Sequence, residues 1–338
     1  MARPLITVLA IAYNRREFIR TALLSAIHQT LPRDLYEIVL VTNFSVDPDI
    51  LEAGKIRVIL SDVRELGPKL ASVVPQCQGE VISFLEDDDV WLPEKLEHVR
   101  NVFETFPRVS YYHNNWSVVD IEGNCISHPI HIQGRRKIIS MRTYTIDKNA
   151  SYADIRKAVH LTGDFNGSSI SIKKSVVSGV INYLEQITFS PDSFLFYSAL
   201  FAGGELYLDS ETLTRYRIHP QNISRREAGA SDALTDPTHF IILKMLRSRP
   251  GNEAALKSIE CQMSDIGLES LWIWGFKNRQ KGLKLALNHL KYISLSEFGY
   301  GFLLITFSLL YCLSPRTASS IYSQVYYRER SVSRRKID

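Results

Sequence analysis

The sequence has few cysteines and none of the spacings that would give them a structural role. Its four cysteines are scattered over 338 residues, with no closely spaced pair among them. Disulfide-rich secreted domains and zinc modules both need such pairs. We therefore expect free thiols in a reducing compartment, and we expect the protein to be cytoplasmic.

Two further signals are missing. The apolar run Leu5–Ala12 is short and is preceded by almost no basic residues, so it predicts a buried first strand instead of a secretory signal. Basic and aromatic residues are not interleaved as on a nucleic-acid-binding face. The composition, with 45% hydrophobic and 22% charged residues, is that of a globular protein with a sizeable core and no nucleic-acid partner.

Long apolar stretches are also scarce. The uncharged segment Phe298–Leu313 falls short of the roughly 20 residues that span a bilayer. From Ser314 onward, basic residues exceed acidic ones by the whole net charge of +4. An apolar segment beside a basic tail indicates an anionic membrane surface. We expect residues 296–338 to associate with the cytoplasmic face of the cell membrane; a buried helix or a dimer contact is the alternative.

The first part of the chain alternates between apolar strands and helical stretches. The expected strands are Leu5–Ile11, Glu37–Val41, Ile56–Leu60 and Glu80–Leu85, with helices at about 17–29, 67–77 and 93–105. Apolar strands without alternation, separated by helices, predict a mostly parallel sheet covered on both faces. The expected fold class is therefore α/β, and ligands should bind beyond the carboxyl ends of the strands.

The pattern changes further along the chain. Residues 120–124 predict a turn between two strands, and the polar stretch 128–165 predicts a loop over the site. The later elements expected are strands at 168–172, 205–209 and 213–218, a helix at about 191–202, and helices at 253–263 and 281–293. We expect a main domain over 1–225, a helical extension over 226–295 and the membrane-associated segment after it.

A cluster of four carboxylates, Glu86 to Asp89, directly follows one of the apolar strands. It could be a solvated helix start, since the dipole of the helix opened by Pro93 favours acidic residues. One or two carboxylates would be enough for that role. Three or four after a buried strand favour a site for Mg²⁺ or Mn²⁺, which take oxygen ligands and bridge phosphates.

Three stretches together resemble the family 2 glycosyltransferases with the GT-A fold. They are LITVLAIAYNRREFIRTALLSAIHQTLPRDLYEIVLVTNFSVD near the N-terminus, GEVISFLEDDDVWL at 79–92, and SPDSFLFYSALFAGGELYLDSETLTRYRIHPQNIS from Ser190 onward. The resemblance covers about residues 4–225. It implies a Rossmann-like sheet that binds a nucleotide sugar.

The resemblance also implies roles for individual residues. The family's D-x-D metal motif falls on Glu86 and Asp88, with Asp87 and Asp89 beside them, and we expect Asp89 to serve the following helix as well. His219 matches a histidine that approaches the diphosphate or the metal. Asp192 takes the position of the catalytic base, which would accept the proton of an acceptor hydroxyl while the anomeric configuration inverts. An N-cap of the following helix is the alternative for Asp192, because Ser190-Pro191 precede it.

The nucleotide pocket is implied to lie after the first strand, lined by Tyr13, Asn14 and Arg15. Arg15 and Arg217 could pair with phosphates. The family's D-D-G-S motif is Thr42-Asn43-Phe44-Ser45 here, so an amide stands where a carboxylate is usual, and Lys69 replaces part of the family's A-R-N segment. The nucleotide, UDP or GDP, is left open by these departures.

The resemblance implies a metal-dependent, inverting glycosyltransferase that acts on a glycan or a polyprenyl-linked saccharide. The altered second-strand motif leaves open a non-catalytic protein that binds nucleotide sugars or glycans. A nucleotidyltransferase is disfavoured, because AYNRRE contains no glycine for a phosphate loop after the first strand.

Overall fold

The computed structural model describes residues 5–126, 143–188, 191–222 and 237–274, with short pieces at 131–132 and 135–136 and single positions between 306 and 317. Contacts divide the chain into two compact units. The first comprises 1–127, 137–219 and 237–252, and the second comprises 128–136, 220–236 and 253–338. The candidate site lies in the first unit.

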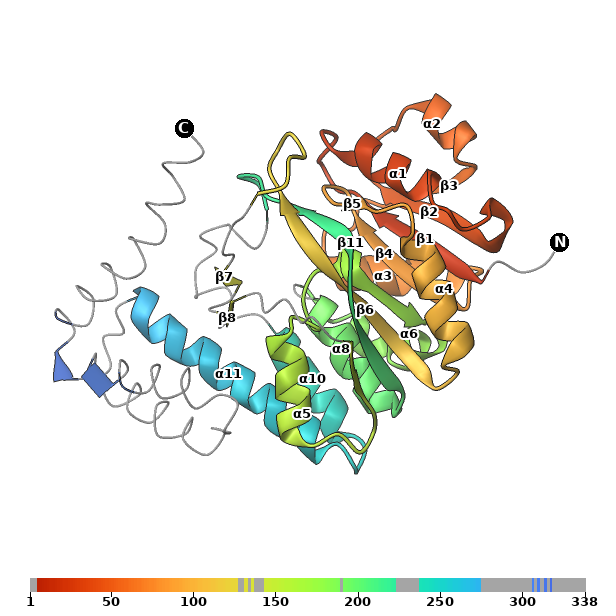
Figure 1. Cartoon of the computed structure of the whole chain (residues 1–338). Coiled ribbons are helices and arrows are strands. Elements are labelled where there is room, and N and C mark those ends of the chain that lie inside the picture. Colours follow the sequence, from red (N-terminus) through yellow and green to blue (C-terminus); the bar gives the residue numbers. More distant parts are fainter. Residues whose placement is uncertain are drawn as a thin grey trace. The chain divides into compact units, whose positions relative to one another are not determined.

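The first unit is built on a nine-stranded sheet, with the order β3-β2-β1-β4-β10-β6-β11-β5 and β9 paired to β11 (Figure 1). The strands are β1 Ile6–Ile11, β2 Tyr36–Thr42, β3 Ile56–Leu60, β4 Val81–Glu86, β5 Val90–Trp91, β6 Val109–Val119, β9 Tyr144–Ile146, β10 Ile170–Lys173 and β11 Glu205–Arg217. Strands β1 to β4 pair in parallel, as do β6 and β11, whereas β10 is antiparallel to both of its neighbours. The mixed α/β fold with a mostly parallel sheet confirms the prediction.

Helices cover both faces of this sheet. Val8 and Leu9 point to opposite faces of β1, and both are fully buried. On the face of Val8, helices α1 and α4 contribute Ala22, Leu23 and Val99 to one core. The helices of the first unit are α1 Ile19–Ile27, α2 Pro48–Ala53, α3 Leu66–Val73, α4 Lys95–Thr105, α5 Tyr152–His160, α6 Lys174–Gly179, α7 Ile181–Leu184, α8 Pro191–Ala202 and α10 Thr238–Arg247, with 3₁₀ turns at Arg33–Leu35, Val74–Gln76 and Gly167–Ser169.

The stretch predicted as a loop over 128–165 is partly regular. Its described part contains β9, which pairs with β11, and α5. Helix α5 begins with a capping box, in which Ser151 and Asp154 each accept the other's backbone amide hydrogen. This S-x-x-D signal was present in the sequence, so the loop prediction was wrong there.

Two other boundaries differ from the predictions. The helix expected over 67–77 ends at Val73 and continues as a 3₁₀ turn that contains Pro75, because proline lacks the amide that an α-helix needs. The strands expected at 205–209 and 213–218 form one strand, β11, with irregular register between Asp209 and Thr212. The turn at 120–124 is confirmed, with Gly123 at positive φ and a bridge between Val119 and Cys125.

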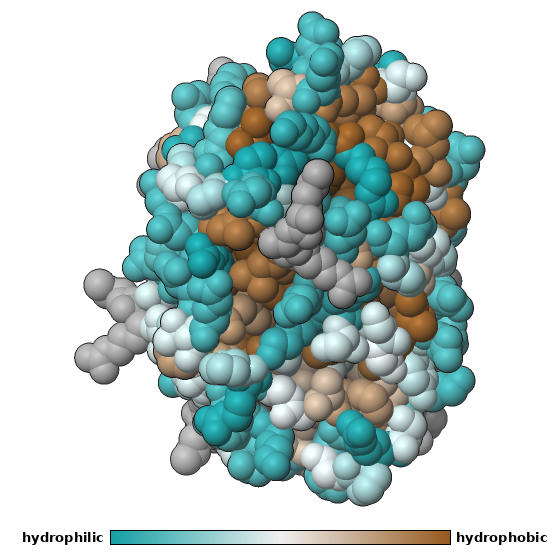
Figure 2. Space-filling view, turned by 90° about the vertical axis from the view of Figure 1, so that its right-hand side faces the viewer, coloured by the Kyte–Doolittle hydropathy of each residue, from teal (hydrophilic) through white to brown (hydrophobic). Residues whose placement is uncertain are grey.

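The second unit contains α11 (Glu253–Trp274), together with the short pair β7 (His131–Ile132) and β8 (Arg135–Arg136). Among the described residues, no helix is long and apolar enough to cross a membrane. Most of Phe298–Leu313 and the basic tail lies outside the described residues, as does the expected helix at 281–293. On the face seen in Figure 2, hydrophobic areas alternate with hydrophilic ones.

Candidate active site

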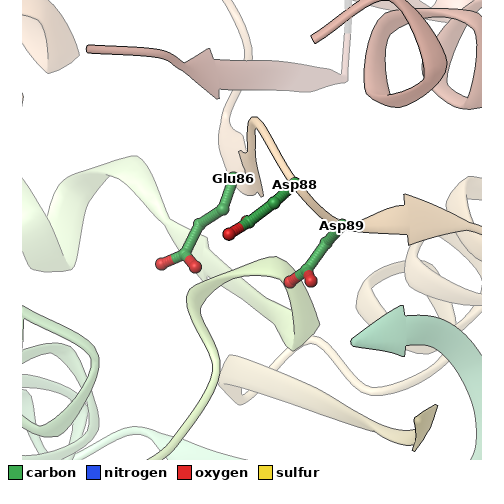
Figure 3. A group of neighbouring side chains, drawn as sticks. All are labelled: Glu86, Asp88 and Asp89. Atoms are coloured by element: carbon green, nitrogen blue, oxygen red, sulfur yellow. The ribbon is translucent and has the colours of Figure 1, made fainter. Parts of the chain in front are cut away.

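The acidic residues form a tight turn at the carboxyl end of β4. Glu86 is the last residue of that strand, and the Asp89 amide donates to its carbonyl at 3.4 Å. Oxygen atoms of Glu86, Asp88 and Asp89 lie within 4.8 Å of one another, and Figure 3 shows the three side chains on the same side of the turn. Asp89, expected to serve the next helix, is fully buried within this cluster.

Burial and nearby negative charges raise the proton affinity of Glu86, Asp87 and Asp89. Burial is the larger cause and the charge of Asp88 the next. Together they raise the pKa of Glu86 well above its ordinary value and the pKa of Asp89 to about 8. Burial also raises the pKa of Asp87 to about 6, although its bond with Arg15 acts in the opposite direction. Clustered, desolvated carboxylate oxygens are the donor set that a divalent cation requires.

The helix-start interpretation of the cluster does not fit the geometry. Helix α4 begins at Lys95, after the short strand β5, and its N-cap residue Glu94 makes no side-chain capping bond. Asp89 instead accepts the backbone amide hydrogen of Arg217 at 3.0 Å, from a strand 128 residues further along the chain.

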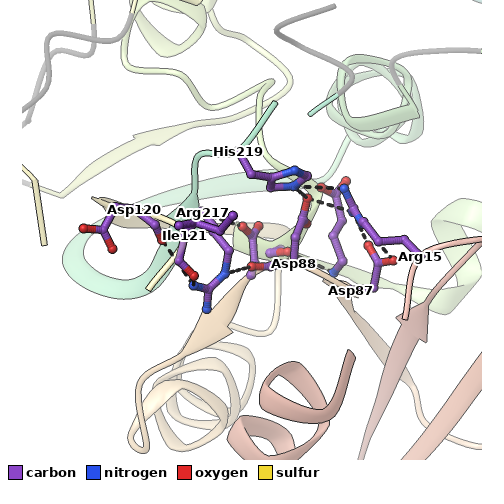
Figure 4. A network of polar contacts seen from close by, with 10 residues as sticks. Arg15, Asp87, Asp88, Asp120, Ile121, Arg217 and His219 are labelled. Carbon is purple, nitrogen blue, oxygen red and sulfur yellow. Dashed lines mark hydrogen bonds and ion pairs between the residues drawn. The ribbon is translucent and has the colours of Figure 1, made fainter. Parts of the chain in front are cut away.

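Strand pairing brings the end of β11 to the acidic turn. Trp91 and Val90 pair with Thr214 and Arg215, and continuing that antiparallel register places Arg217 beside Asp88. The Arg217 guanidinium donates to backbone carbonyls: Nε to Asp88 at 2.9 Å, and Nη1 to Asp120 and Ile121 at 3.2 and 2.8 Å (Figure 4). Because these carbonyls occupy the guanidinium, Arg217 holds the acidic turn in place, which argues against the expected contact with a phosphate.

Arg15 and His219 lie 204 residues apart in the sequence and converge on the acidic turn. Arg15 bonds both oxygens of Asp87 and lies 2.7 Å from Asp88 Oδ2. His219 Nε2 lies 2.9 Å from the same Asp88 oxygen and 3.0 Å from Arg15 Nη1. Burial lowers the pKa of Arg15, but the bond and charges of Asp87 and Asp88 outweigh it and raise the value. The structure therefore brings together His219, Asp88 and Asp87, as expected, with Arg15 at their centre.

The other residues expected in the nucleotide pocket lie around the ends of β1 and β2. Asn14, at positive φ, donates its amide hydrogen to Asn43 Oδ1 at 2.9 Å, and Asn43 Nδ2 donates back to Asn14 Oδ1 at 2.7 Å. Lys69 Nζ lies 4.4 Å from the centre of the Tyr13 ring. Burial lowers the pKa of Lys69, partly offset by Asp87 and Glu65. Asn43 stands where the family usually has a carboxylate. Its side-chain amide thus uses its oxygen as an acceptor and one N–H as a donor in the pair with Asn14.

Asp192 lies in the first turn of α8, and its side chain is directed to another segment. Its Oδ2 accepts the Asn166 amide hydrogen at 3.1 Å. Burial, followed by the charge of Asp164, raises the pKa of Asp192 to about 6. Asp192 also contributes to the raised pKa of Glu86, so the predicted base and the acidic cluster share one electrostatic environment.

Lys95 was not predicted from the sequence, but it lies close to the site. It lies at the start of α4 and is fully buried, with Nζ 2.6 Å from Ser168 O and 2.6 Å from Asn114 Oδ1. Its position in the sequence did carry a signal, because Lys95, Val99, Val102 and Phe103 are spaced as one buried helical stripe.

Comparisons with known proteins point to one family of enzymes. Residues 7–154 match the model of the family described as glycosyl transferase family 2. An uncharacterized glycosyltransferase of Rickettsia bellii is 25% identical over 231 residues, which cover 66% of this chain and 31% of that protein. Another, of Nostoc sp., is 26% identical over 240 residues, covering 67% of this chain and 68% of the relative. The chain thus spans about a third of the Rickettsia relative's length.

A solved structure shares the fold over most of the chain. The crystal structure of S. aureus TarS 1-349 in complex with UDP-GlcNAc superposes with a TM-score of 0.62 and 13% identity, covering 94% of this chain and 91% of that one. At this identity the likeness establishes the fold alone. The family resemblance and the GT-A fold expected from the sequence are confirmed.

Proposed function

The chain carries a glycosyltransferase domain of family 2 with the GT-A fold, and from that premise we propose that it transfers a sugar from a nucleotide-sugar donor to a hydroxyl group, with inversion and with a divalent cation. The observation that carries the proposal is a cluster of three carboxylates together with one further carboxylate, Asp192, whose charge acts on Glu86. Glu86, Asp88 and Asp89 cluster at the end of β4, and Asp192 approaches from α8 through the turn at Asn166.

Asp192 is suited to the role of catalytic base. An efficient base has a pKa close to the working pH, and burial together with Asp164 raises that of Asp192 to about 6. It is therefore ionised at neutral pH and still able to accept a proton. In this proposal Asp192 accepts the acceptor hydroxyl proton as the oxygen attacks the anomeric carbon.

The acidic turn fits Mn²⁺ or Mg²⁺. Glu86, Asp88 and Asp89 would hold the cation, with His219 beside Asp88. Such a cation, when bound, stabilises the negative charge that develops on the nucleoside diphosphate leaving group. Arg15 and Lys69 are cationic groups at the carboxyl ends of the strands, where they can contact the donor's phosphates.

Two observations favour a class of donor and a class of acceptor. TarS 1-349 has been crystallised with UDP-GlcNAc, which favours a UDP-linked sugar, with a GDP-linked sugar as the alternative. The basic C-terminal tail favours an acceptor at the cytoplasmic membrane surface, such as a polyprenyl-linked saccharide. A bare polyprenyl phosphate would need no base, so the presence of Asp192 favours a hydroxyl acceptor.

A donor panel tests the proposal directly. Thermal unfolding is measured with UDP- and GDP-linked sugars, each with and without Mn²⁺, and transfer or donor hydrolysis is measured in parallel. We expect one nucleotide sugar to raise the melting temperature only when metal is present, and we expect turnover of that donor. Metal-dependent binding without turnover would favour a non-catalytic binding protein, and no binding of any donor would refute the proposal.

A further inference from the structure

The carbonyl of Ser168 is the centre of a buried hydrogen-bond network. It accepts hydrogen bonds from three side chains on three different elements: Lys95 Nζ at 2.6 Å, Trp91 Nε1 at 2.8 Å and Thr214 Oγ1 at 3.2 Å. A carbonyl oxygen has two lone pairs, so three donors are more than a typical backbone group attracts. The short turn Asn166–Ser169 is thus fixed from outside by α4, β5 and β11.

This turn connects the two halves of the proposed active site. On one side, Ser168 Oγ accepts the amide hydrogen of Glu86 at 3.0 Å. On the other side, the Asn166 amide donates to Asp192 Oδ2 at 3.1 Å. Within the turn, Ser168 N donates to Asn166 Oδ1 at 3.1 Å. A displacement of Ser168 would therefore move Glu86 and Asp192 relative to each other.

Lys95 makes the shortest of the three hydrogen bonds to the Ser168 carbonyl, at 2.6 Å, and its side chain is fully buried. Its ammonium also donates to Asn114 Oδ1 at 2.6 Å and lies 4.6 Å from the centre of the Trp91 ring. Burying an ammonium group is costly unless its hydrogen bonds are satisfied. Because Lys95 Nζ lies closer to the Ser168 carbonyl than Trp91 Nε1 or Thr214 Oγ1 does, Lys95 is the donor whose loss should disturb this turn most.

Resting on the proposed function, we propose that Lys95 is a positioning residue: by holding the Ser168 carbonyl it sets the placement of Asp192 relative to Glu86. Lys95 contacts neither of these carboxylates through the bonds described above, and it acts through the Asn166–Ser169 turn. Its effect should therefore fall on the rate of transfer and leave donor binding in place.

The test compares Lys95→Met with Lys174→Met. Lys174 is a matched control, because its ammonium also donates to two backbone carbonyls, those of Pro75 and Cys77, away from the site. For Lys95→Met we expect kcat to fall about tenfold to a hundredfold, the effect of a small misplacement of catalytic groups, with the donor KM unchanged. For Lys174→Met we expect neither parameter to change.

A measurement independent of activity uses the backbone amide protons of Asn166 and Glu86. Because each donates to a group of the network, its NMR chemical shift reports that hydrogen bond. Both shifts should change in Lys95→Met and stay constant in Lys174→Met. Trp91→Phe removes one donor to Ser168 but keeps an aromatic ring, so it should change both chemical shifts in the same direction. This variant replaces Lys95→Met in the test if Lys95→Met does not fold.

The outcomes separate the two proposals. If the parent protein turns over a donor and Lys95→Met matches it in kcat, or changes KM and kcat together, the positioning role is refuted. Unchanged amide shifts in Lys95→Met and Trp91→Phe refute it as well. If the parent turns over no donor, the proposed function fails, and the amide shifts still decide whether Lys95 holds the turn.

Discussion

Replacing Asp192 with asparagine should change activity and stability in opposite directions. The substitution keeps the size of the side chain and leaves an oxygen that can accept the Asn166 amide hydrogen, but it removes the charge and the capacity to bind a proton. If Asp192 is the catalytic base, Asp192→Asn loses about 10²–10⁴-fold in kcat, the contribution typical of general base catalysis.

The stability effect follows from the pKa of the carboxyl group. Burial and Asp164 raise the pKa of Asp192 from 3.8 to about 6. Between these two values the folded state keeps a proton that the unfolded state has released, so stability falls as the pH rises through this window. At neutral pH the ionised carboxylate costs up to about 3 kcal/mol. Because the residue is only partly buried, we expect Asp192→Asn to gain about 1–3 kcal/mol.

Two assays check this prediction. Urea unfolding at pH 7 and pH 5 should show the gain at pH 7 and a smaller gain at pH 5. The parent's kcat should fall about tenfold between pH 7 and pH 5, since about nine tenths of a group with a pKa of about 6 is ionised at pH 7 and only about a tenth at pH 5. Asp49→Asn, which alters an exposed carboxylate, is the control and should behave as the parent. If Asp192→Asn turns over the donor as fast as the parent and shows the same fall in kcat at acidic pH, Asp192 is not the catalytic base.

Three further predictions concern the acidic turn. Asp88→Asn should abolish the metal-dependent rise in melting temperature with donor, because Asp88 lies at the centre of the cluster; a rise equal to that of the parent would contradict the metal assignment. Arg217→Lys should lower the free energy of unfolding by about 2 kcal/mol, because an ammonium group cannot hold three carbonyls in one plane, and an unchanged urea midpoint would show that these bonds contribute little. Gly167→Ala should slow transfer, because an added Cβ would lie 3.0 Å from Glu86 Oε1; kcat equal to that of the parent would mean that Glu86 can shift without loss.

Much of the site could be predicted because its residues follow regular elements. The carboxyl ends of parallel strands meet at one edge of a sheet, so the segments after β1, β2 and β4 were expected to lie together. The Asn14–Asn43 pair and the contact of Arg15 with Asp87 agree with that expectation. The roles proposed for these residues, and for Asp192, stay predictions until they are measured.

The sequence by itself determined strands β1 to β4, helices α1, α3 and α4, and the acidic turn at the end of β4, because these depend on local periodicity and on residues that are neighbours in the chain. Only the tertiary structure decided which groups meet the carboxylates. Asp89 bonds the backbone of Arg217, and His219 approaches Asp88, because β5 pairs with β11 in one particular register. Lys95 donates to the Ser168 carbonyl, 73 residues further along the chain, because the packing of distant segments brings the two together. Such partners lie far apart in the sequence, and no local pattern specifies the register that joins them.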